Sequence, residues 1–150
     1  MMKHLALSLL VLGATAAASS AQTGTAAGRY DPATERTYGG VVTSVISVAG
    51  SDGTVGVHLN LKTATGSVVK VQVGPAVFIG MNNFSFLVDD LVLVTGADVS
   101  HAGEEAVWAR QVSKGGHTLV LRSDDGTPRW PFATADDPDG CGVSHDPVRQ

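Results

Sequence analysis

Apolar and polar residues alternate along two neighbouring segments of this sequence, and this alternation limits the possible fold more than any other feature. Residues 55–62 alternate without a break, and residues 69–73 alternate again after a short turn at 64–67. Successive side chains of a β-strand point to opposite faces, so a period of two predicts strands with one buried face. Two such strands joined by a short polar turn form a hairpin. The buried side of the first of them is expected to carry Val55, Val57, Leu59 and Leu61.

The flanking segments extend this hairpin into an all-β domain. Residues 38–48 are rich in Val, Ile and Thr and predict a long first strand, bent at Gly39–Gly40. A short helix is expected at 76–81, with Pro75 at its first position. Three later strands are expected at residues 91–96, 104–112 and 117–122. A helix between the third and fourth strands is the order of the OB-fold, so we expect a small five- to six-stranded OB-like barrel.

The start of the chain has the pattern of an export signal. Lys3 precedes a short apolar stretch, and the small residues Ser19 and Ala21 stand at positions −3 and −1 of a predicted cleavage site. The apolar stretch is shorter than the roughly 20 residues that a membrane-spanning helix needs. We therefore expect cleavage after Ala21, a periplasmic or secreted protein, and no membrane span after cleavage.

Composition divides the rest of the chain into a folded part and two flanking segments. The segment before Tyr30 is small and polar, and the segment after Pro131 is rich in Asp, Pro and Gly, with too little apolar content to pack. The expected organisation is a signal peptide at 1–21, a flexible leader at 22–29, an OB-like barrel at 30–131 and a disordered tail at 132–150.

Charge and cysteine content narrow the classes of function. The net charge is −4, and it becomes −5 without residues 1–21, which hold one lysine and no acidic residue. A nucleic-acid binder needs a basic surface to replace the counterions of phosphate, so the composition disfavours nucleic acid as a partner. Cys141 is the single cysteine, so the chain has no internal disulfide and no CxxCH haem site.

Two pairs of residues are candidates for ligand binding. His58 and Asn60 lie on the polar side of the second predicted strand, and strands two and three of an OB-fold commonly hold the ligand. Trp108 and Arg110 share one face of the fifth predicted strand, where an aromatic ring and a guanidinium could stack on a base or a sugar. The structural alternatives are a solvated face for His58, a core position for Trp108, and an acidic partner for Arg110.

A metal site is a further hypothesis. Cys141 and His145 have a C-x-x-x-H spacing, and thiolate and imidazole suit zinc or copper. His58, His101 and His117 could complete a metal-handling set. A closed site needs more ligands than the tail supplies, so a free thiol or a crosslink between two chains are the alternatives for Cys141.

Several short segments resemble a group of exported bacterial proteins. They are YDPATE at 30–35, GVHL at 56–59, GPA at 74–76, VTG at 94–96, AR at 109–110, and 121–130, which ends in G-x-P-x-W. In these segments the chain resembles exported bacterial OB-fold proteins, which are small periplasmic proteins of unknown function. It also has a distant likeness to magnetosome-associated OB-like domains. The resemblance implies the barrel fold and export, and it implies no particular activity.

The motifs of hydrolases are absent from the sequence: there is no G-x-S-x-G, no H-E-x-x-H and no phosphate-cradling glycine motif. We therefore expect a non-enzyme without a cofactor. The leading hypothesis is an exported periplasmic binding or accessory module for a small ligand or a protein partner. The alternatives are an OB-type oligosaccharide or nucleic-acid binder and a periplasmic metal-handling protein.

Overall fold

The computed structural model describes residues 29–50, 53–101 and 103–131. The predicted signal peptide, nearly all of the leader, and the tail with Cys141 and His145 lie outside these residues. No helix within these residues is long and apolar enough to cross a membrane.

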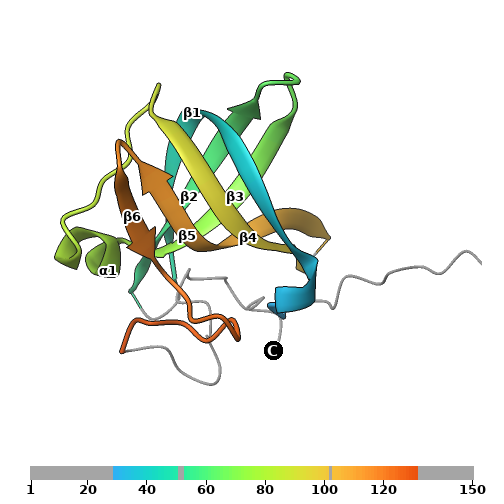
Figure 1. The fold of residues 1–150 in the computed structure, drawn as a ribbon. Helices are drawn as coiled ribbons and strands as arrows, with labels where there is room; N and C mark the ends of the chain where they lie inside the picture. The colour runs from blue at the N-terminus through green and yellow to red at the C-terminus, as the bar shows by residue number, and fades with distance from the viewer. Residues whose placement is uncertain (1–28, 51–52, 102, 132–150) are drawn as a thin grey trace, which may run out of the picture.

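Six strands and one short helix make up the described domain (Figure 1). After a 3-10 turn, η1 (Pro32–Thr34), the elements are β1 (Glu35–Ala49), β2 (Val55–Thr63), β3 (Val68–Pro75), α1 (Ala76–Met81), β4 (Leu91–His101), β5 (Glu104–Lys114) and β6 (His117–Val120). Their hydrogen-bonded order is β3-β2-β1-β4-β5-β6, and a parallel pairing of β3 with β5 closes the sheet into a ring. The expected small all-β barrel with a helix between the third and fourth strands is therefore confirmed.

The barrel interior is apolar, as the alternation predicted. Leu59 and Leu61 of β2 are fully buried in the core, and Val57 packs against it. The expectation for Val55 is wrong, because its side chain is 40% exposed. Val55 starts β2 and pairs with Ala49 at the end of β1, so it lies beyond the last side chains of the core.

Several strand ends differ from the prediction, and the end of β4 matters for the site described below. β4 continues to His101 instead of ending at Gly96, because its second half pairs with β5 from Ala109 back to Glu104. β6 ends at Val120 instead of residue 122. Pro75 is the N-cap of α1 and the last residue of β3, one position earlier than expected.

Gly40 lies where β1 pairs with both of its neighbouring strands. β1 pairs with β4 through its first half and with β2 through its second half, and the two pairings overlap at Gly40 and Val41. A Cβ atom at Gly40 would lie 2.7 Å from the carbonyl oxygen of Lys62, which is too close for any side chain. The predicted role of this glycine in shaping the long strand thus has a steric basis.

The segment after β6 closes one end of the barrel, as the orange trace in Figure 1 shows. Arg122 and Pro128 form an isolated bridge, and Trp130 is buried in the core cluster. The Trp130 ring packs against Gly74: one ring carbon lies only 3.1 Å from where a Cβ of Gly74 would be. The same ring contacts the Phe78 ring of α1 edge-on, with 5.8 Å between the ring centres. Residues 121–130 are therefore an integral part of the domain.

Candidate functional site

The clearest candidate site is a cleft at the open mouth of the barrel, at the end of β3 opposite to α1. Here the first residues of β1, β3 and β5 and the last residues of β4 project past the apolar core. They enclose about 620 Å³. The lining residues that matter for the argument below are Arg36 and Tyr38 of β1, Val69 of β3, Asp98 of β4, and Glu105 and Val107 of β5.

Strand register shows that these side chains point to the inside of the barrel. Tyr38 is paired with the core residue Val94, and Asp98 is paired with the core residue Val107. Directly paired residues of an antiparallel sheet project to the same face, and residues two apart on one strand do so as well. The polar lining of the cleft is thus the continuation of the core positions beyond the point where the core ends.

Tyr38 and Asp98 form the fixed part of the mouth. The Tyr38 hydroxyl donates a hydrogen bond to Oδ1 of Asp98 at 2.6 Å, across the pairing of β1 with β4. Burial, and then the hydrogen bond to the Asp98 carboxylate, raises the pKa of Tyr38 to about 12. The phenol therefore stays neutral at ordinary pH and holds Oδ1, so Oδ2 is the Asp98 oxygen that Tyr38 does not engage.

The charges at the mouth favour a cation. Arg36 approaches Oδ2 of Asp98 at 3.8 Å from a largely exposed position, a geometry that contributes little binding energy. Glu105 is exposed and forms no ion pair within the described residues. Two carboxylates above an apolar floor of Val69 and Val107 can hold a small cationic group attached to a short apolar body.

The described residues supply no metal cage. They hold no group of three or more His, Cys, Asp or Glu side chains that could bind a metal ion. Of the predicted histidines, His58 is on β2 and His117 is exposed at the start of β6, two strands that are not neighbours in the sheet. The side chain of His101, together with Cys141 and His145, lies outside what the structure describes.

The predicted pair on β2 has a more enclosed setting than a solvated face. His58 is half-buried, and burial lowers its pKa despite the opposing charge of Glu104. Its Nε2 atom is buried and has no hydrogen-bond partner within the described part of the chain. Asn60 donates a hydrogen bond to the hydroxyl of Ser44 at 2.8 Å, so its amide group is held by β1.

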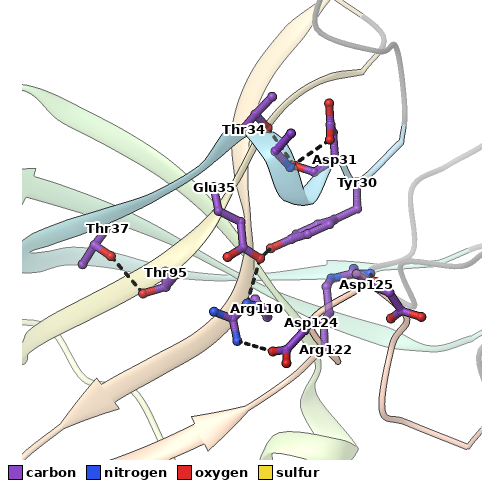
Figure 2. A network of polar contacts seen from close by, with 12 residues as sticks. Tyr30, Asp31, Thr34, Glu35, Thr37, Thr95, Arg110, Arg122, Asp124 and Asp125 are labelled. Carbon is purple, nitrogen blue, oxygen red and sulfur yellow. Dashed lines mark hydrogen bonds and ion pairs between the residues drawn. The ribbon is translucent and has the colours of Figure 1, made fainter.

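The predicted pair on β5 is held in a structural network. Trp108 is only 2% exposed and lies under the guanidinium of Arg122, so no open ring face is left for a base or a sugar to stack on. Arg110 donates to Glu35 at 2.7 Å and to Asp124 at 3.3 Å, and the Glu35 carboxylate also accepts from Tyr30 (Figure 2). Trp108 faces outward, because it is paired with Ala97 outside the barrel core.

Sequence reasoning missed the residues of the mouth. The predicted fourth strand ends at residue 96, before Asp98, and Tyr38 is only the first residue of the predicted first strand. Their contact joins residues 60 positions apart and depends on the register of β1 with β4. A longer fourth strand, with the alternation continued through Asp98, is the signal that could have found the site.

Comparison with known proteins places the chain in a family. The model of the MamS/MamX magnetosome protein family matches residues 34–119, which is more than half of the chain and spans β1 to β6 apart from its last residue. No curated protein matches the sequence. The matched region includes every residue that lines the mouth except Ala33. The chain therefore belongs to the MamS/MamX magnetosome protein family.

Proposed function

We propose that this protein is an exported, non-catalytic binding or accessory module whose barrel is of the OB type and holds a small ligand at its mouth. The OB assignment is supported by the closure of β3 against β5 and by the helix between the third and fourth strands. Export is supported by the pattern of residues 1–21. Membership of a magnetosome protein family is in keeping with an accessory role, and the family description names no ligand.

The observation that carries the proposal is the cleft at the mouth. It has the proportions of a small-molecule site, with an apolar floor and a few polar groups at fixed places. The Asp98 carboxylate is oriented by Tyr38, and Glu105 lines the same cleft from the neighbouring strand β5. The ligand class that fits is a primary ammonium or a guanidinium on a short apolar chain.

The same geometry makes nucleic acid and oligosaccharide less suitable ligands than a small cation. A phosphate backbone needs free cations at the site. The two cations that line the mouth lie beside carboxylates: Arg36 approaches Asp98, and Lys70 is paired with Glu104 at 3.1 Å. An oligosaccharide can bind through carboxylates, yet it gains most from an open aromatic face, and the Tyr38 ring is packed against the core. A small cation therefore comes first.

Calorimetric titration of the full mature chain tests the proposal, with agmatine as the probe. Agmatine carries a guanidinium and an ammonium on a four-carbon chain. We expect measurable binding that weakens at least tenfold in Asp98→Asn. The matched control is Asp124→Asn, which removes a fully exposed carboxylate that does not line the mouth and should bind as the wild type does.

Two results would contradict this proposal. One is an absence of binding heat with agmatine at millimolar concentration. The other is equal loss of binding in Asp98→Asn and Asp124→Asn, which would mean that only the net charge matters. Chitotriose and oligothymidylate are run in parallel, and binding of either one in place of agmatine would favour the corresponding alternative.

A further inference from the structure

A second surface of the barrel has no assigned role: the outer face of β1 and β4. Three directly paired rows form it, and we name it the uncharged face. Its residues are Thr37 and Thr95, Gly39 and Leu93, and Val41 and Leu91. Leu91 is 71% exposed and Leu93 is 50% exposed, although large leucine side chains gain free energy from burial. The two strands run side by side in Figure 1.

The shape of this face is that of a groove. The residues around Gly39 and Leu93 enclose about 840 Å³. The Leu93 side chain lies against Gly39, since its Cδ1 atom is 3.5 Å from where a Cβ of this glycine would be. Ser113 extends the Gly39–Leu93 row onto β5 without adding a charge. Contiguous exposed apolar side chains on a soluble protein commonly mark a site of interaction. Depletion of charge with apolar side chains at the centre is the composition of a protein–protein interface core.

Charges of opposite sign flank the groove. Lys62 pairs with Val41 on the β2 side, and Asp89 lies on the β4 side, where its N–H donates to the carbonyl of Val42 at 2.8 Å. Both residues line the groove. Neither forms an ion pair within the described residues, whereas the neighbouring Lys114 and Asp90 are joined at 2.9 Å.

We propose that the uncharged face is the interface between two copies of this chain, packed sheet against sheet. Lys62 and Asp89 stand on opposite sides of β1 at nearly the same height along it. A two-fold axis that runs along β1 within the interface therefore places Lys62 of each copy against Asp89 of its partner. An isologous contact requires this self-complementarity, because the same patch meets itself. An acyl chain or an apolar small molecule would fill the groove without using either charge.

Sedimentation velocity of the full mature chain tests the interface, with a reductant present so that Cys141 cannot crosslink two copies. We expect a dimer, and we expect Leu93→Lys to raise the dimer dissociation constant at least tenfold. The matched control is Val77→Lys on α1, which places the same charge at a similarly exposed apolar position outside the face. It should leave the dimer intact.

A charge-reversal cycle separates loss of the interface from loss of the fold. Lys62→Asp alone and Asp89→Lys alone should weaken the dimer, and the double variant should restore it. Thermal melting of each variant shows that the domain remains folded. A monomer at all concentrations overturns the proposal, and so does a dimer that Leu93→Lys leaves unchanged or a double variant no better than either single one. Binding of detergent or lipid by a monomer through this groove would also overturn it.

Discussion

The guanidinium carbon of Arg122 lies 5.1 Å from the ring centre of Trp130, and both side chains are almost completely buried. The rings of Tyr30 and Trp108 flank the same guanidinium, each at 5.4 Å, and its Nη1 donates to the carbonyl of Gly126. One buried cation thus joins the chain before β1, the outer face of β5 and the segment after β6. This arrangement explains why Trp108 is buried although it points away from the barrel interior.

Replacement of Arg122 should be costly. Arg122→Ala removes a buried cation from three aromatic rings and leaves a cavity among them, so we expect a loss of about 2–4 kcal/mol in the free energy of unfolding. Urea denaturation followed by tryptophan fluorescence measures it directly. The exposed Arg129, seven residues on, is the control, and Arg129→Ala should cost less than about 0.5 kcal/mol. Equal effects of the two changes would show that the aromatic cage contributes nothing.

Truncation should separate the closing segment from the tail. A chain that ends at Phe132 keeps Arg122 and Trp130, and we expect it to melt within a few degrees of the full mature chain. A chain that ends at Val120 loses both side chains and should melt far lower or fail to fold. Calorimetry of the three chains decides the matter, and a large loss on removing only residues 133–150 would mean that the tail packs on the barrel.

The middle and the start of β2 should respond differently to truncation of an apolar side chain. Leu59 is buried in the core, so Leu59→Ala should cost about 2–5 kcal/mol. Val55 lies at the exposed start of the strand, and Val55→Ala should cost less than about 1 kcal/mol. Chemical denaturation of both variants tests the register of β2. A larger loss at Val55 would contradict the assignment of its faces.

His58 should make the domain sensitive to acid. Burial lowers the pKa of His58 in the folded chain, so at pH values below the ordinary histidine range the unfolded chain binds the proton more readily. The stability that neutral His58 permits is therefore present above that range and is lost as the pH falls. We expect the wild type to lose more free energy of unfolding between pH 7.5 and pH 5 than His58→Gln does. Parallel pH profiles of the two proteins would refute this.

Local features of the sequence predicted much of the fold, because strand periodicity and helix signals act over a few residues. The alternation at residues 55–62 marked β2, and the expected bounds of α1 agree with Ala76–Met81. Features that depend on contacts between distant segments could not be predicted from local patterns. The exposure of Val55 and the burial of Trp108 depend on where the barrel ends and on which segment covers its outside.

The candidate site was less predictable than the fold for the same physical reason. Asp98 becomes part of a site only because the register of β1 with β4 brings the Tyr38 hydroxyl to it. Arg110 was expected either to bind a ligand or to pair with an acid, and the structure pairs it with Glu35. The sequence shows that these residue types are present, but which of them come into contact depends on the strand register.

The most direct test of the central claim is a nuclear magnetic resonance titration of the ¹⁵N-labelled mature chain with agmatine. We expect the amide shifts to cluster at the mouth and to saturate together with one dissociation constant. The residues concerned are Arg36, Tyr38, Asp98 and Glu105. In Asp98→Asn these shifts should be lost while the rest of the spectrum stays unchanged. Shifts centred on His58 and Asn60 of β2, or no saturable shifts at all, would contradict a binding site at the mouth of the barrel.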